Sequence, residues 1–276
     1  MLRGLYSSAS GMNAELLCQD VVANNIANAG TTGFKKDDAV FESFPERLLQ
    51  RIHDRMDTAG AAGMGPGAAA AMAAWGPSAT TVGSLGQGVM PVGTPTHFTD
   101  GSPRMTNRPL DLTLQGDGLF TVQRSDGSLA YTRDGSFTLN SDHQLTTMAG
   151  DLVMAKGDRP LVLKGTDIVV GAHGDVTVDG ADAGTLELAA YNPQTYQKLG
   201  ENLYVKQEDA FSMLGKEPAP TGRILQGYTE ESNVQIVTEM VHMIAVDRAY
   251  ESNSKIVQMQ DETLGHLIND AGKPAA

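Results

Sequence analysis

Only one cysteine, Cys18, occurs among the 276 residues, and this excludes a framework of internal disulfide bonds. Aromatic residues are scarce, at 5% of the chain, so a single large aromatic core is not expected. The 20 Lys and Arg are outnumbered by 33 Asp and Glu. The resulting net charge of −13 argues against a nucleic-acid groove and against a polybasic membrane patch, and we expect no nucleic acid among the partners.

Long apolar runs are missing as well. No window of about 20 apolar residues is present, so no direct membrane insertion is expected. The N-terminal stretch MLRGLYSSASGMNAELL has neither a continuous apolar region nor an Ala-x-Ala cleavage site. We therefore expect no cleaved signal peptide.

The sequence motifs of common catalytic and cofactor sites are also absent. The six His form no close pair of metal ligands, and neither a G-x-S-x-G turn nor a Walker phosphate loop occurs. Four turn aspartates could suggest calcium, but they lack the EF-hand spacing and suit hairpin turns; they are Asp117, Asp126, Asp134 and Asp142. We predict no catalytic, cofactor-binding or metal-binding residues and no enzyme activity. Two carboxylates that meet in the fold could still hydrolyse a glycoside, although nothing points to it.

Each end of the chain has a helical pattern. Residues 2–28 and 233–267 place apolar side chains at spacings of three and four, which is typical of amphipathic or coiled-coil helices. Ser232 or Asn233 is expected to cap the second helix. The rows are Leu2, Leu5, Ala9, Met12, Leu16, Gln19, Ala23 and Ile26, then Val234, Val237, Val241 and Ile244. One helix cannot bury such a row alone, so we expect the two to pair.

Between the helices the pattern changes to short alternating runs. The run LDLTLQGDGLFTVQ (110–123) alternates leucine with polar residues and turns at Gly-Asp-Gly, and similar units follow it. Such runs, separated by Asp-Gly and Ala-Gly turns, predict antiparallel strands. The Ala/Gly-rich tract before them has too little apolar bulk for a core and too many Gly and Pro for a long helix.

These patterns predict an α+β fold that is mostly β in its middle domain, with terminal helices that pair as a coiled-coil-like domain. The expected divisions are an N-terminal helix and signature segment (1–57), an Ala/Gly-rich linker (58–90), a β domain (91–227) and a C-terminal helix (228–276) that pairs with the first division.

The segment VVANNIANAGTTGFKK (21–36) places Asn24, Asn25 and Asn28 where the first helix ends. Side-chain amides can satisfy the free backbone groups there, and Gly30 and Gly33 can take up the turn. One cap normally suffices, so the excess has two interpretations. It is either an over-capped helix end within one subunit or a polar junction between subunits, and composition alone does not decide between them.

Three separated motifs resemble those of the bacterial flagellar rod and hook protein family. SASGMNAELLCQDVVANNIANAGTTGFKK is similar to its N-terminal signature, and ESNVQIVTEMVHMIAVDRAYESNSKIVQMQDETL is similar to its closing helix. GTPTHFTDGSPRMTNRPLDLTLQGDGLFTV resembles the β domain of rod proteins. The resemblance covers most of the chain outside 58–90, and the short length favours a rod protein over a hook protein.

The resemblance implies a structural axial subunit of the flagellar basal-body rod. Such a subunit leaves the cell unfolded through the flagellar type III export apparatus and needs no cofactor. Outside the cytoplasmic membrane it assembles helically with itself and with other rod and hook subunits, and transmits torque from motor to hook. The alternatives are a hook or rod–hook junction protein and, from another class, a secreted β-domain binding module; a wall hydrolase ranks last.

The resemblance also favours assembly over simple over-capping for the end of the first helix. We expect contacts between subunits from apolar and polar residues near both ends of the chain. The candidates are Leu5, Met12, Leu16, Asn24, Asn25, Ile26, Asn28, Gly33, Phe34, Val237, Val241, Ile244, Arg248, Tyr250, Asn253 and Ile256.

Overall fold

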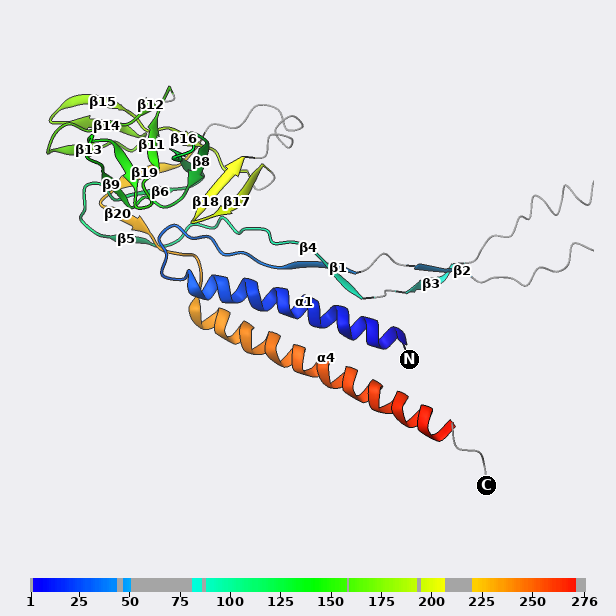
Figure 1. The fold of residues 1–276 in the computed structure, drawn as a ribbon. Coiled ribbons are helices and arrows are strands. Elements are labelled where there is room, and N and C mark those ends of the chain that lie inside the picture. The colour runs from blue at the N-terminus through cyan, green and yellow to red at the C-terminus, as the bar shows by residue number, and fades with distance from the viewer. Residues whose placement is uncertain are drawn as a thin grey trace, which may run out of the picture. The chain divides into compact units, whose positions relative to one another are not determined.

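The computed structural model describes residues 2–43, 47–50, 81–85, 88–157, 159–192, 195–206 and 220–271. A helix lies near each end of the chain and antiparallel strands lie between them, which confirms the predicted α+β class (Figure 1). The chain divides into two compact units. The first unit draws on Met1–Leu17, Val40–Gly93 and Asp247–Ala276, and the second on Cys18–Ala39 and Thr94–Val246.

The helices are α1 (Leu2–Ala27) and α4 (Ile236–Ala271), which confirms a helix at each end. Neither of these described helices is long and apolar enough to cross a membrane. Neither expected cap binds a backbone amide of α4, since the Ser232 hydroxyl accepts a hydrogen bond from the Val234 amide (3.2 Å), which precedes the helix. The Asn233 side chain instead accepts a hydrogen bond from the Lys36 amide (2.8 Å) and donates one to the His97 carbonyl (2.8 Å), so it joins loops and the helix begins three residues later.

Within the first unit, α1 and α4 lie side by side and run antiparallel (Figure 1). A Cβ atom at Gly11 would lie 3.0 Å from Asn253 Nδ2, and one at Gly4 would overlap the Gln260 side-chain amide. The contacts with α4 are thus made at Gly4 and Gly11, each one residue before a member of the expected row, Leu5 and Met12. Hydrophobic periodicity cannot detect such a contact, because glycine carries no apolar side chain and acts by letting the helices approach.

The strands of the first unit form two antiparallel ribbons. They are β1 (Val40–Ser43) with β4 (Val89–Gly93), and β2 (Arg47–Gln50) with β3 (Thr81–Leu85). Strand β3 and the start of β4 belong to the expected linker 58–90. Most of that linker lies outside the described residues.

The second unit contains the antiparallel β domain. Its strands are β5 (Pro103–Met105), β6 (Leu112–Gln115), β7 (Leu119–Gln123), β8 (Leu129–Thr132), β9 (Phe137–Leu139), β10 (Leu145–Thr147), β11 (Leu152–Ala155), β12 (Arg159–Pro160), β13 (Ile168–Val170), β14 (Asp175–Val178), β15 (Ala181–Thr185), β16 (Leu188–Ala189), β17 (Tyr196–Gly200), β18 (Leu203–Lys206), β19 (Arg223–Gln226) and β20 (Tyr228–Glu230). Seven of them follow the order β17-β18-β8-β7-β11-β10-β9 in a nine-stranded sheet, with β12 beside β11 and β16 beside β7. Strand β19 pairs with β6, β20 pairs with β5, and β13, β14 and β15 form a separate sheet.

Alternation explains the core of this domain. Leu112 and Leu114 of β6 are each 2% exposed, as the leucine–polar alternation predicts for a sheet with one covered face. Phe120 of β7 is fully buried and meets Phe137 edge-on, with ring centroids 5.2 Å apart. Because Thr113 between the two leucines is also buried, the strand is covered on both faces, which alternation alone does not indicate.

Aromatic side chains gather around Tyr204 beside this core. Phe98 stacks on Tyr191 with ring centroids 3.3 Å apart and meets Tyr204 edge-on at 5.0 Å. Burial, with a smaller contribution from the charge of Asp37, raises the pKa of Tyr191 to about 12 and that of Tyr204 further. The Tyr204 hydroxyl is buried and has no hydrogen-bond partner among the described residues.

We expect the free energy of unfolding to fall as the pH rises above about 10. In the unfolded chain both phenols ionise near pH 10, whereas in the folded chain they keep their protons, so their contribution is present below that pH and is lost above it. Urea denaturation between about pH 8 and pH 11 would measure this loss. The Tyr204→Phe variant should lose less stability over that range, and the same pH dependence in both proteins would contradict the prediction.

Candidate assembly interface

An exposed apolar row runs along the first turns of α4. Ile236, Val237, Met240, Val241 and Ile244 are 48, 76, 53, 63 and 53% exposed. Their alternating spacing of one and three residues places them on one face of the helix. Burying one such side chain stabilises a protein by about 1.5–3 kcal/mol, so this face, which we call the α4 row, has the character of an interaction surface.

The neighbouring face of the same turns is buried within the chain. Glu239 is 6% exposed and Val246 is 5% exposed. The sequence grouped Val234 with Val237 in one row, but Val234 precedes the helix and is 8% exposed, whereas Val237 points to solvent. This part of α4 therefore has one face that packs in its own chain and another that remains available.

The predicted contact residues of α1 differ in exposure. Leu16 is 43% exposed, whereas Leu5, Met12 and Ile26 are half-buried. Tyr6, which the sequence did not single out, is 69% exposed. Leu16 is thus the most accessible of the four predicted apolar positions on α1.

Further along α4 the predicted residues divide in the same way. Arg248 is exposed and Tyr250 is 38% exposed. Ile256 is half-buried, and Asn253 faces Gly11 of α1 in the same chain. Asn253 therefore has an intramolecular neighbour in the helix pair.

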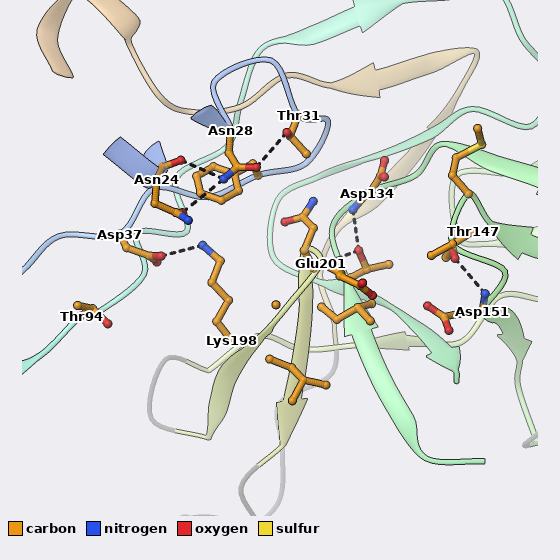
Figure 2. A pocket seen from close by; sticks show the side chains of 18 of the residues that line it. Asn24, Asn28, Thr31, Asp37, Thr94, Asp134, Thr147, Asp151, Lys198 and Glu201 are labelled. Atoms are coloured by element: carbon orange, nitrogen blue, oxygen red, sulfur yellow. Dashed lines mark hydrogen bonds and ion pairs between the residues drawn. The ribbon is translucent and has the colours of Figure 1, made fainter. Parts of the chain in front are cut away.

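The end of α1 is held by side-chain amides of its own chain (Figure 2). Asn25 Nδ2 donates to the Asp37 carbonyl (2.8 Å), and the Asp37 amide donates to Asn25 Oδ1 (3.0 Å). Asn28 Nδ2 donates to the Asn24 carbonyl (3.0 Å), and the Thr31 hydroxyl donates to Asn28 Oδ1 (3.2 Å). The additional amides therefore have partners within a single chain. Asn28 caps the end of the helix, and Asn25 holds the segment that follows it at Asp37.

Gly33 and Phe34 complete this junction. Gly33 has φ +66° and is buried, whereas Gly30 lacks a positive φ, so only Gly33 needs the left-handed conformation. Phe34 is 4% exposed, with Lys198 Nζ 4.0 Å from its ring centroid. Together with Asn25, which is 1% exposed, these residues act inside the chain in this structure. Their predicted place at a junction between subunits stays a prediction, since the structure holds one chain and shows only their contacts within it.

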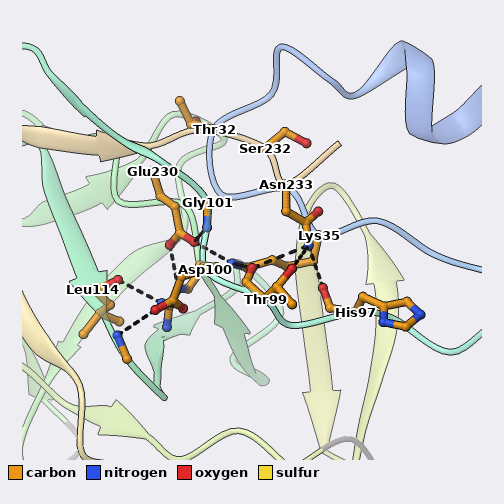
Figure 3. Close-up of polar contacts among 12 residues, drawn as sticks. Thr32, Lys35, His97, Thr99, Asp100, Gly101, Leu114, Glu230, Ser232 and Asn233 are labelled. Atoms are coloured by element: carbon orange, nitrogen blue, oxygen red, sulfur yellow. Dashed lines mark hydrogen bonds and ion pairs between the residues drawn. The ribbon is translucent and has the colours of Figure 1, made fainter. Parts of the chain in front are cut away.

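A buried ion network joins the signature segment to the residues before α4 (Figure 3). Lys35 Nζ lies 2.5 Å from Glu230 Oε1 and donates to the Thr99 carbonyl (2.7 Å). Arg133 Nε lies 2.7 Å from Glu230 Oε2, and Arg133 Nη2 lies 3.1 Å from Asp100 Oδ1. One carboxylate thus pairs with two cations from distant parts of the sequence.

The Lys35, Arg133 and Glu230 side chains are at most 2% exposed, whereas Asp100 is 53% exposed. Burial lowers the pKa of Lys35, and the carboxylate of Glu230 acts in the opposite direction. Neither Glu230 nor Arg133 was identified from the sequence as a partner of Lys35. No sequence signal could have paired them, because 195 residues separate Lys35 from Glu230.

Among the residues that the structure describes, no group of three or more His, Cys, Asp or Glu could hold a metal ion. The features that stand out are therefore an exposed apolar helix face and an internally braced joint at the end of α1.

Three family models match the chain. "Flagella basal body rod protein" matches residues 5–35, "Flagellar hook protein FlgE/F/G D1 domain" matches 113–178, and "Flagellar basal body rod FlgEFG protein C-terminal" matches 225–270. The chain is 34% identical to the flagellar basal-body rod protein FlgG of Buchnera aphidicola subsp. Baizongia pistaciae, over 97% of this chain and 99% of that protein. It is 34% identical to FlgG of Borreliella burgdorferi, over 98% of each chain. It is 29% identical to the flagellar hook-basal body complex protein FlhO of Bacillus subtilis, over 99% of this chain and 100% of that protein.

Proposed function

The chain belongs to the flagellar basal-body rod protein family as a structural axial subunit, and from this we propose that its helices bind further copies of itself and other rod and hook subunits. The observation that carries the proposal is the α4 row, which a lone chain leaves in water. Ile244 at its centre is 53% exposed, and burial against a neighbour would stabilise the assembly by about 1.5–3 kcal/mol for each such side chain.

The assembled form that fits this role is a helical tube. A rod that transmits torque from motor to hook needs contacts that repeat without closing, and heterologous contacts provide that. We propose Leu16 on α1 and the α4 row as the contacts. Leu16, Val237, Val241 and Ile244 are the predicted apolar positions with the greatest exposure, and Ile236 and Met240, which were not named from the sequence, lie on the same face of α4.

We place the protein in the flagellar basal body, outside the cytoplasmic membrane. We propose that the chain leaves the cell unfolded through the flagellar type III apparatus, because its relatives are basal-body rod proteins. We propose no catalytic activity and no nucleic-acid partner. A place at the rod–hook junction is the second candidate, and the likeness to the hook-basal body complex protein of Bacillus subtilis favours it.

The Ile244→Asp variant tests the assembly proposal. A carboxylate on the α4 row should prevent incorporation into the rod, because an unpaired charge would have to be buried in each contact. The measurement is the amount of the chain in basal bodies purified from a bacterium that carries only the variant, together with swimming. We expect hook-bearing basal bodies to be lost.

His242→Asp is the matched control, since His242 is exposed on the same helix but lies away from the α4 row. It introduces the same residue into the same turns, so any general effect on the helix appears in both variants. Circular dichroism should show that both purified proteins keep the β domain folded. Normal swimming with Ile244→Asp would refute the proposal.

A further inference from the structure

A hollow of about 650 Å³ opens beside the end of α1 in the second unit (Figure 2). Its walls are the last turns of α1 with Phe34, the β10–β11 turn (147–151), and the β17–β18 turn with its flanks (198–203). Met148 and Leu199 at its rim are 71 and 51% exposed. The rim therefore offers two large apolar side chains that this chain does not cover.

The hollow is also negatively charged. Asp37 is already paired with Lys198, at 2.9 Å, but the Asp20, Asp151 and Glu201 carboxylates have no hydrogen bond or ion pair with any described residue. Helix α1 has no basic residue in its last turn, so the negative end of its dipole at this hollow lacks a cation from the helix itself. An apolar rim with a negative interior suits a segment that carries cations beside an apolar side chain.

The segment 102–108, with the sequence SPRMTNR, has that chemistry. It contains two arginines and no acidic residue, and Met105 between them is 62% exposed. Arg104 is exposed on β5. The Arg108 side chain is 56% exposed, and its Nη1 lies 3.7 Å from the Asp111 carboxylate of the same chain, so Arg104 is the less engaged of the two cations. The segment therefore presents its cations and its methionine to solvent.

The same segment is held in place before any partner arrives. Strand β5 pairs with β20, and the amides of Thr106 and Asn107 both donate to the Gly227 carbonyl, at 2.9 and 3.1 Å. A segment fixed in this way loses little conformational entropy on binding. Elsewhere, the exposed cations Arg248 and Lys255 of α4 have Glu251 between them, so they match a negative hollow less well.

We propose that, in the assembled rod, the hollow of one subunit receives the 102–108 segment of a second copy of this chain. Met105 packs against Met148 and Leu199 of the neighbour, and the two arginines face the carboxylates of Asp151, Glu201 and Asp20. The contact is heterologous, because the hollow and the segment are different surfaces, and it therefore repeats from subunit to subunit. The inference rests on the proposed function and assigns to the β domain a contact distinct from the α4 row.

Disulfide trapping tests the contact directly, because Cys18 is the only cysteine of the chain. In a Cys18→Ser background, Met105→Cys and Met148→Cys are combined, and purified basal bodies are oxidised. We expect a ladder of covalently linked subunits. The control combines Met105→Cys with Leu129→Cys, since Leu129 is 41% exposed on β8 away from the hollow, and it should give monomers.

Charge exchange provides a second, independent measurement. Arg104→Glu and Asp151→Lys should each lower the amount of the chain in basal bodies by about fivefold, and the combined variant should restore it, since an exchanged pair attracts again. Rods that carry both cysteines but form no ladder would overturn the proposal. So would single charge variants that enter basal bodies in the same amount as the unchanged chain. A combined variant whose amount in basal bodies does not recover would also overturn it. The unchanged chain in the same preparations tests the rod function separately from the proposed contact. If the unchanged chain were absent from basal bodies, the rod function itself would be contradicted.

Discussion

Replacing Glu230 with glutamine should lower the free energy of unfolding by about 3–5 kcal/mol. Glu230 accepts bonds from Lys35 and Arg133, and all three side chains are at most 2% exposed. Without this carboxylate two cations remain buried, and only the half-exposed Asp100 stays near them. Urea denaturation of the full chain, followed by circular dichroism, measures the change.

Glu231→Gln is the control for this prediction. Glu231 is exposed, and its backbone amide, not its side chain, bonds to the Ser102 carbonyl. The control removes the same charge from the adjacent position, so we expect a change within about 0.5 kcal/mol. If the two variants unfolded at the same urea concentration, the network would not stabilise the fold as we infer.

The second large effect is expected from Gly33→Ala, at about 3 kcal/mol of lost stability. Gly33 has φ +66°, a conformation that costs a residue with a Cβ atom about 1–2 kcal/mol. The new Cβ would also lie 2.6 Å from the Arg133 carbonyl carbon. That carbon belongs to the main chain, which cannot move aside as a flexible side chain can. The shift would also strain the hydrogen bond from the Gly33 amide to the Glu230 carbonyl, at 2.8 Å, and so disturb the ion network.

Gly30→Ala, three residues earlier, is the control. It tests whether the loss of stability is specific to position 33 or follows any glycine-to-alanine change in this segment. Apart from its two chain neighbours, no described residue has an atom within 4 Å of a Cβ at Gly30, and the φ of Gly30 is not positive. Alanine there should leave stability unchanged within about 0.5 kcal/mol or raise it slightly, because the unfolded chain loses freedom. Thermal unfolding of the two variants under the same conditions decides the matter, and equal midpoints would contradict the assigned role of Gly33.

The sequence predicted the helices, the antiparallel β class and the family because these depend on local order. A spacing of three and four specifies a helix face, and alternation between Gly-containing turns specifies a strand. The signature 21–36 could be recognised because its asparagines and glycines lie close together. Each of these signals is complete within a few tens of residues.

The candidate site was predicted less completely. Val237, Val241 and Ile244 could be named from spacing, and all three are exposed on the α4 row. Asn25 and Phe34 carry the right chemistry but are buried in their own chain. Helical periodicity indicates that a residue belongs to a face, but not whether that face meets its own chain or another.

What the sequence determined by itself is the set of elements, a helix at each end and antiparallel strands between, together with the family to which they belong. Only the tertiary structure decided how Lys35, Arg133 and Glu230 meet, since an ion pair across 195 residues leaves no periodic trace. It also decided that Gly4 and Gly11 bring α1 against α4 in the first unit. The ion network and the helix contact have the same physical reason. Burial and close approach depend on two surfaces that meet, whereas a pattern along the sequence describes only one of them.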